Sequence, residues 1–151
     1  MRRVAAGWCG LALLGTVLAP AASMAASGEM LVVTDLAGRQ VTLSQPARRV
    51  VCLIESALSA LYMLGAEDRV VGISTNVYDT GVSPYYAAMD PRVRQRTLPT
   101  PGNWDFVNLE SVVALQPDLV VAWASQEESI RALEEKGIPV YAVFVSRFED
   151  V

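Results

Sequence analysis

Two tryptophans stand where an α/β protein commonly holds a ligand. Trp104 follows the Pro-Gly-Asn segment 101–103 in a loop, where a large aromatic side chain has little reason to join the core. Trp123 closes the apolar run 119–122, and ligands of open α/β sheets bind at the carboxyl ends of strands. A tryptophan face offers apolar area for stacking on a flat or bulky ligand. Both residues are candidates for ligand contact. For Trp104 the alternative is a loop residue packed against its own domain, and for Trp123 core packing is an equal alternative.

Two polar residues end the first long apolar run, residues 49–54. Glu55 and Ser56 follow it directly, and the end of a buried strand is again a common place for ligand contacts. Ser56 is also a predicted helix cap, because its side-chain oxygen can accept a backbone N–H bond. Both residues are therefore candidates for ligand contact, and Glu55 has capping as its alternative role.

Three tyrosines lie in the segment 74–103, whose prolines and glycines disfavour long regular elements. Phenols can stack on a ligand, hydrogen-bond it or ligate ferric iron. Tyr78 is the better candidate for ligand contact, because Tyr85 and Tyr86 also fit the role of anchoring a short helix.

Charged residues allow two further roles. Arg92, Arg94 and Arg96 alternate along the chain, which predicts a solvated edge; the alternative is a cationic contribution to an anionic ferric chelate. Glu110 lies in the first turn after Asn108, a predicted helix cap, where the helix dipole favours a carboxylate by about 0.3–1 kcal/mol. The dipole alone would account for a glutamate at that position.

Groups that would do catalysis are missing from the sequence. It contains no histidine, no Gly-x-Ser-x-Gly elbow and no phosphate-binding glycine loop, which disfavours an enzyme and excludes a histidine-built metal site. Of the cysteines, Cys9 falls in a predicted leader and Cys52 falls in a predicted strand. We expect Cys52 to be a buried small hydrophobe rather than a reactive thiol.

Residues 1–25 are typical of a secretory signal peptide. Two arginines precede the apolar run 4–18, which is shorter than the ~20 residues of a spanning helix, and small residues mark a cleavage site after Ala25. We expect export with cleavage there; a retained membrane anchor is the alternative. Losing the two arginines takes the net charge from −4 to −6, which disfavours nucleic acid and anionic membranes as partners.

The rest of the chain alternates predicted strands and helices. Strands are expected at 31–34, 40–43, 49–54, 69–73, 119–123 and 140–145, and helices at 56–64, 84–89, 108–116 and 126–136. Gly38 can take the positive φ of a hairpin turn between the first two strands. Gly65 and Gly137 are predicted to end the first and last of these helices. Strands separated by helices through short loops predict an α/β fold, with a mostly parallel sheet flanked by helices on both faces.

Six short segments follow the signal peptide in an order that is specific when they are taken together. They are Asp35–Leu43, Pro46–Val51, Leu64–Ser74, Trp104–Glu110, Leu115–Val121 and Lys136–Val140. This order, running from about Thr34 to the end of the chain, resembles the iron-siderophore and cobalamin class of periplasmic binding proteins. Members of that family have two α/β lobes joined by one long helix, and they hold the ligand between the lobes.

The resemblance implies a domain organisation. Residues 26–145 would form the Rossmann-like N-terminal lobe, and residues 146–151 would begin the interlobe helix, with Ser146 and Glu149 as a capping box. We expect the natural protein to continue into a C-terminal lobe that this sequence lacks.

The resemblance also implies residue roles. Trp104 and Trp123 would face the ligand, and the segment with Tyr78, Tyr85 and Tyr86 would lie opposite Trp104. Glu110 of the Asn-Leu-Glu motif would project towards arginines of an ABC transporter permease. The implied protein is a periplasmic monomer that is not an enzyme and carries no resident cofactor or metal. Its ligand would be a ferric siderophore, haem or cobalamin. A sensor or surface receptor built on the same lobe is the alternative, and an α/β enzyme is less favoured.

Overall fold

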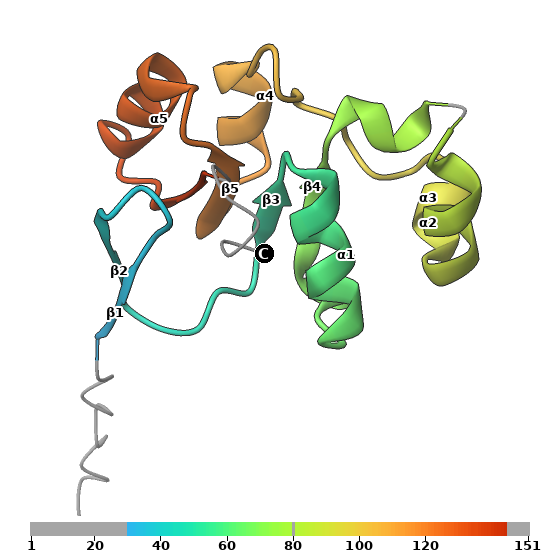
Figure 1. Cartoon of the computed structure of the whole chain (residues 1–151), viewed down its shortest axis with the longest axis horizontal. Helices are drawn as coiled ribbons and strands as arrows, with labels where there is room; N and C mark the ends of the chain where they lie inside the picture. The colour runs from blue at the N-terminus through green and yellow to red at the C-terminus, as the bar shows by residue number, and fades with distance from the viewer. Residues whose placement is uncertain (1–29, 80, 145–151) are drawn as a thin grey trace, which may run out of the picture.

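The fold is a four-stranded parallel sheet with helices on both faces and a separate antiparallel hairpin beside it (Figure 1). The computed structural model describes residues 30–79 and 81–144. The strands are β1 (Leu31–Thr34), β2 (Gln40–Leu43), β3 (Val50–Cys52), β4 (Val70–Ile73), β5 (Leu119–Trp123) and β6 (Val140–Val143). The helices are α1 (Glu55–Met63), α2 (Ser83–Met89), α3 (Pro91–Arg94), α4 (Leu109–Ala114) and α5 (Glu127–Glu134), with 3-10 turns at Glu67–Arg69 and Thr75–Tyr78.

The predicted signal peptide and the predicted helix start at Ser146 lie outside the described residues. Within the described ranges, no helix is long and apolar enough to cross a membrane.

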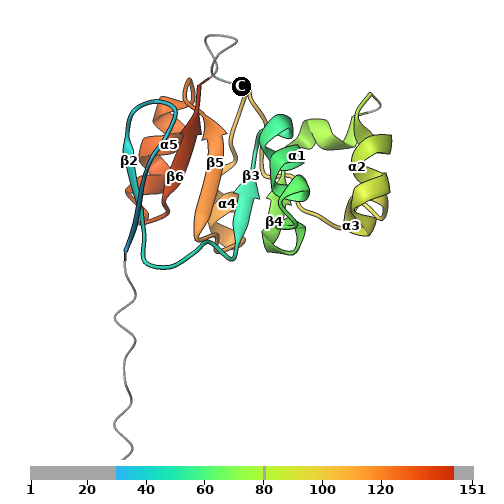
Figure 2. The ribbon, with the colours of Figure 1, turned by 60° about the horizontal axis from the view of Figure 1, so that its bottom comes forward.

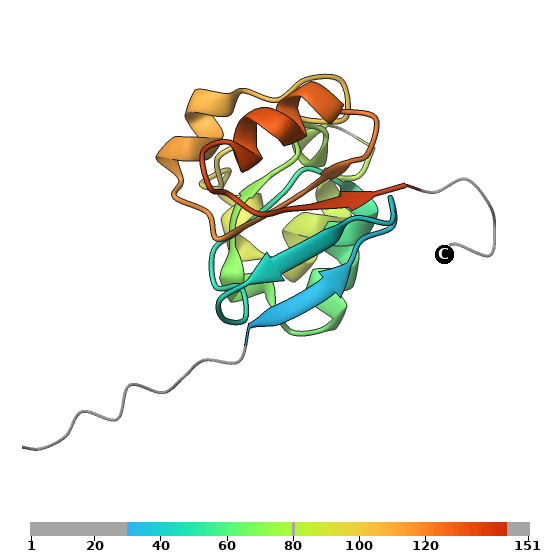
Figure 3. The same cartoon turned by 90° about the vertical axis from the view of Figure 1, so that its left-hand side faces the viewer.

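Strand β3 lies inside the sheet, whose order is β4-β3-β5-β6 (Figure 2). Val50, Cys52 and Ile54 belong to the apolar cluster that includes α1, α2 and α3. Val51 and Leu53 belong to the cluster formed with α4 and α5. Burying one such aliphatic side chain stabilises the fold by about 1.5–3 kcal/mol. The prediction of a strand covered on both faces is confirmed, and Figure 3 shows α4 and α5 gathered on one side of the sheet.

Helix ends follow local chemistry at three of the four predicted signals. Asn108 caps α4, since its side-chain oxygen accepts the Ser111 N–H at 2.9 Å. Gly65 and Gly137 take positive φ, 66° and 76°, just after α1 and α5. The fourth prediction is wrong, because Ser56 does not cap α1. The helix begins one residue earlier, at Glu55, and the N-cap position is held by Ile54, whose side chain makes no capping hydrogen bond. The buried run leads directly into the helix because Ile54 is itself fully buried.

The irregular segment holds more helix than predicted. A helix near 84–89 is confirmed as α2, whereas α3 and the turn Thr75–Tyr78 were not predicted. Asp90 begins α3 by accepting the Arg92 backbone N–H at 2.8 Å, and proline follows at the first helical position. Single-turn elements of this kind leave too little periodicity for a sequence pattern.

Cys52 is fully buried, as expected. Its Sγ donates to the Ile54 carbonyl at 3.3 Å. Burial raises the pKa of the Cys52 thiol to about 12, so the reactive thiolate is suppressed at neutral pH.

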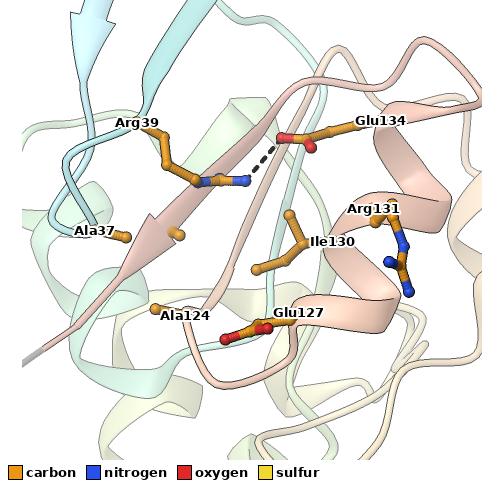
Figure 4. Close-up of a pocket in the computed structure, with 8 residues that line it drawn as sticks. Ala37, Arg39, Ala124, Glu127, Ile130, Arg131 and Glu134 are labelled. Atoms are coloured by element: carbon orange, nitrogen blue, oxygen red, sulfur yellow. Dashed lines mark hydrogen bonds and ion pairs between the residues drawn. The ribbon is translucent and has the colours of Figure 1, made fainter.

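Asp35 and Arg39 attach the hairpin to the sheet and to α5. Asp35 is buried; its carboxylate accepts the Arg39 Nε–H at 2.9 Å and the backbone N–H of Ala142 in β6 at 3.1 Å. The Arg39 guanidinium then donates to Glu134 of α5 at 2.9 Å (Figure 4). It also donates to the Val140 carbonyl at 2.8 Å. Two ion pairs that share Arg39 thus help to hold the hairpin against β6 and α5.

Replacing Asp35 with Ala is expected to lower the free energy of unfolding by about 1–3 kcal/mol, because buried N–H groups lose their acceptor while Arg39 stays partly solvated. Burial alone would raise the pKa of Asp35, but the N–H groups of Arg39 and Ala142 and the Arg39 guanidinium hold it below its ordinary 3.8. The stabilisation is therefore complete above that pH and is lost as pH falls below it.

Urea unfolding from pH 7 to pH 3 checks this. The Asp35→Ala variant should lose less stability on acidification than the wild type. Glu135→Gln, at an exposed position that ends α5, serves as the control. An acid dependence as steep in Asp35→Ala as in the wild type contradicts the assignment.

Candidate ligand-binding site at the carboxyl edge of the sheet

A pocket of ≈ 400 Å³ opens where the parallel strands end, which we term the carboxyl edge. It is lined by Glu55, Asn76, Trp104, Trp123 and Ser125. Glu55 follows β3, Asn76 follows β4, and Trp123 ends β5. The structure thus brings together three of the predicted site residues, Glu55, Trp104 and Trp123, because parallel strands deliver the residues at their carboxyl ends to one edge.

A second hollow of ≈ 620 Å³ adjoins the first and shares Glu55, Asn76 and Trp104 with it. Its additional lining residues are Asp79, Gly81, Val82 and Asp105. Pockets of 300–1,000 Å³ are the usual size for small-molecule and cofactor sites. The combined surface therefore has room for one face of a large ligand.

The loop that carries Trp104 depends on Gly102. Its carbonyl accepts the Thr75 N–H at 2.9 Å, and isolated bridges tie it to Ser74 and Val107. A Cβ at Gly102 would come within 2.5 Å of the Phe106 carbonyl oxygen. Only glycine fits here, for reasons of space rather than φ. Two residues further along this loop, Trp104 is 58% exposed.

Three amide side chains brace this loop against the sheet. Gln126 donates to the Asn103 carbonyl at 2.8 Å and accepts the Trp123 N–H at 3.3 Å. Asn103 donates in turn to the Asn76 side-chain oxygen at 3.2 Å. Sequence reasoning missed these positioning residues, since an isolated Asn or Gln carries no pattern; Gln126 was predicted only as a helix start.

Trp123 belongs to both the core and the pocket. It packs against the apolar cluster of Cys52 and Val121 while lining the pocket. Its indole Nε1 is buried and has no hydrogen-bond partner among the residues that the structure describes. Buried donors without a partner are rare in folded proteins, and each one calls for an explanation. Trp123 thus packs on the core and lines the pocket at once, and its contact with a ligand stays a prediction.

Glu55 is oriented by the neighbouring strand. Its Oε1 accepts the hydroxyl of Ser74, a buried residue that follows β4, at 2.7 Å. Its backbone carbonyl accepts the Tyr86 hydroxyl at 2.6 Å. Glu55 therefore lies in the pocket wall as a fixed carboxylate rather than as a helix cap.

Two predicted site residues lie elsewhere. Ser56 is exposed in the first turn of α1 and lines neither hollow. Tyr78 also lines neither, because its hydroxyl donates to the Leu98 carbonyl at 3.0 Å and the Arg96 guanidinium lies over its ring at 5.1 Å. Burial raises the pKa of the Tyr78 phenol, which disfavours the phenolate that ferric iron binds.

Of the remaining candidate residues, some have structural roles and others are exposed on the surface. Tyr86 is buried and anchors α2, as one reading predicted, whereas Tyr85 is exposed. Arg92 is structural: it pairs with Asp90 at 2.8 Å and donates to the Val70 carbonyl at 3.0 Å, so it is not available to an anionic ligand. Glu110 is exposed in the first turn of α4.

No group of three or more His, Cys, Asp or Glu side chains is arranged to hold a metal ion within residues 30–79 and 81–144. The arrangement at the carboxyl edge offers aromatic faces, a fixed carboxylate and amides. These groups suit non-covalent binding of a flat or bulky molecule.

Gly102→Ala is expected to lower the free energy of unfolding by about 1–3 kcal/mol, because the added methyl collides with backbone. Hydrogen exchange at residues 102–107 should accelerate as the loop loosens. Gly81→Ala is the matched control, since a Cβ there meets nothing within 4 Å; its effect should stay within about 0.5 kcal/mol. Equal effects of the two substitutions would contradict the packing argument.

Comparison with known proteins identifies the family. Residues 50–150 match the model of the periplasmic binding protein family. The molybdate-binding protein MolA of Haemophilus influenzae is 30% identical over 113 residues, which is 74% of this chain and 31% of that protein. Its molybdate-bound structure superposes with a TM-score of 0.66, covering 74% of this chain and 34% of that one.

Further relatives share the same region. The cobalamin-binding protein of Halobacterium salinarum is 32% identical over 108 residues, 71% of this chain and 27% of that protein. A periplasmic solute binding protein of Veillonella parvula is 26% identical and superposes with a TM-score of 0.65, covering 81% of this chain and 37% of that one. The chain spans about a third of the length of the curated relatives it matches. With the parallel sheet and the pocket at its carboxyl edge, these matches show that the chain belongs to the periplasmic binding protein family.

Proposed function

We propose that this chain is the N-terminal lobe of the exported substrate-binding protein of an ABC importer, and that it forms one wall of a cleft for a metal chelate. The ligand is cobalamin, a ferric siderophore or haem. Binding is non-covalent, and the protein delivers its ligand unchanged to the membrane permease. The second lobe would supply the opposite wall.

One observation carries the proposal: Trp104 and Trp123 line a single pocket with Glu55 at the carboxyl edge of the sheet. Two indole faces supply the apolar area that holds a macrocycle or another bulky chelate. Relatives named as cobalamin-binding and vitamin B12-binding proteins support cobalamin within this class.

The tryptophan content makes the pocket directly observable. After removal of residues 1–25, the chain keeps only Trp104 and Trp123, since the third tryptophan is Trp8. In a ¹⁵N-labelled sample of residues 26–151, both indole N–H resonances therefore report on the pocket. We expect cyanocobalamin, or haemin as the iron-chelate probe, to shift both resonances at concentrations up to millimolar.

Trp104→Ala and Trp123→Ala should each weaken binding about tenfold, because a stacked aromatic face contributes on the order of 1 kcal/mol or more. Phe106→Ala is the control: Phe106 is an aromatic of the same loop, 55% exposed, that lines neither hollow. Indole resonances that stay unmoved by both probes would contradict the proposal.

Glu110 is proposed as a docking residue for the permease. It is exposed at the start of α4, six positions after Trp104 on the segment that leads away from the pocket. Exposed charge pairs of this type set docking orientation and association rate more than affinity. Glu110→Lys in the natural protein should therefore reduce uptake of labelled ligand by cells about tenfold, with ligand affinity unchanged.

Glu135→Lys makes the same charge change at an exposed position at the end of α5 and serves as the control. Uptake that falls equally with both variants indicates a general charge effect. Ligand affinity that falls with Glu110→Lys would place Glu110 in the ligand site instead.

A further inference from the structure

Four arginines of this lobe donate to backbone carbonyls at the amino edge of the sheet, where the parallel strands begin. Arg39 donates to the carbonyl of Val140, the first residue of β6, and Arg92 to that of Val70, the first residue of β4. Arg49 and Arg69 donate to carbonyls just before β5 and β3, those of Leu115, Gln116 and Ala47. Four guanidinium groups are thus held at the edge opposite the pocket.

Carboxylates occupy the pocket edge instead. Glu55, Asp79 and Asp105 line the two hollows that share Trp104. Glu127 and Glu128 line a further hollow of ≈ 430 Å³ that also includes Trp104 and Asp105. We term these five residues the acidic rim.

The acidic rim is not neutralised by ion pairs. Within residues 30–79 and 81–144, the recorded ion pairs are Arg39–Asp35, Arg39–Glu134 and Arg92–Asp90, all outside the rim. None of the three hollows around Trp104 is lined by a Lys or Arg of these ranges.

Two arginines lie near the rim in sequence but contribute to other contacts. Arg96 lies over the Tyr78 ring and donates to the Tyr78 carbonyl at 3.3 Å. Arg131 follows Glu127 by one turn of α5, and both line the groove beside Arg39. Figure 4 shows their side chains pointing in different directions, and within residues 81–144 the two form no ion pair.

We infer that this lobe selects its ligand by charge, binding a chelate of zero or positive net charge more tightly than an anionic chelate and excluding small oxyanions. The inference rests on the proposed function, since it assigns the charge of the ligand that the Trp104 pocket holds. Carboxylates beside apolar indole faces repel an anion more strongly than they would in open water. No compensating cation of the described residues faces the pocket.

Two porphyrins with the same ring and opposite charge test the inference. The tetrakis(N-methylpyridyl) compound is cationic and the tetrakis(sulfonatophenyl) compound is anionic. Calorimetry on residues 26–151 should give at least about tenfold tighter binding of the cation at low ionic strength, and the preference should shrink at high salt. Sodium molybdate, the small oxyanion probe, should not bind.

Matched double variants localise the effect. Asp79→Asn with Asp105→Asn removes two charges from the rim. Asp68→Asn with Glu135→Gln removes two exposed charges that precede β4 and β6 at the amino edge. The rim variant should lose most of the preference for the cation, and the amino-edge variant should keep it.

The outcomes separate the two proposals. Equal or tighter binding of the anionic porphyrin, binding of molybdate, or the same loss in both double variants overturns charge selection. The pocket itself stands in those cases if Trp104→Ala still weakens binding. If neither porphyrin shifts the two indole resonances, the pocket is overturned, and charge selection with it.

Discussion

The burial of β3 on both faces is the constraint on which the position of the pocket depends. Residues 50–54 are at most 3% exposed, so β3 must lie inside the sheet with a helical layer on each side. Helical crossovers on both faces make its neighbours parallel. The residues that follow β3, β4 and β5 then meet at one edge, and the fold places Glu55, Asn76 and Trp123 together without any direct bond among the three.

Tight backbone packing at this edge fixes the shape of the pocket wall. Gly102 lies against the Phe106–Val107 backbone and accepts from Thr75, so the loop bearing Trp104 is held to the end of β4. Gln126 and Asn103 extend the hold to β5. Such a brace limits the freedom that Trp104 would lose on binding, and pre-organisation of this kind improves affinity without adding contacts.

Charge is distributed along the sheet axis rather than evenly. Arginines bind carbonyls at the amino edge, where they tie loops and the hairpin to strand starts, and the acidic rim surrounds the opposite edge. The net charge of the chain conveys none of this separation. It results from which arginines the fold uses as structural donors, Arg92 being the clearest case.

The sequence alone determined much of the fold, because many of its elements depend on interactions between neighbouring residues. The continuous apolar runs at β3 and β5, the Asn108 cap, and the glycines that end α1 and α5 act over a few residues, so periodicity and single residue types were enough to identify them. Single-turn helices such as α3 were not predicted, because they are too short to show a periodic pattern. The start of α1 was placed too late, at Ser56, because the position of Ile54 is fixed by burial rather than by a cap.

The candidate site, like the fold, was only partly predictable from the sequence. Sequence and resemblance identified Trp104, Trp123 and Glu55 as site candidates, but only the tertiary structure decided that they share one pocket and that Tyr78 and Ser56 do not line it. It also decided that Gln126 and Asn76 brace the wall and that its charge is negative. These outcomes depend on contacts between residues more than twenty positions apart, such as Asn103 with Asn76 and with Gln126. No local pattern encodes such contacts, because each partner alone is an ordinary polar side chain.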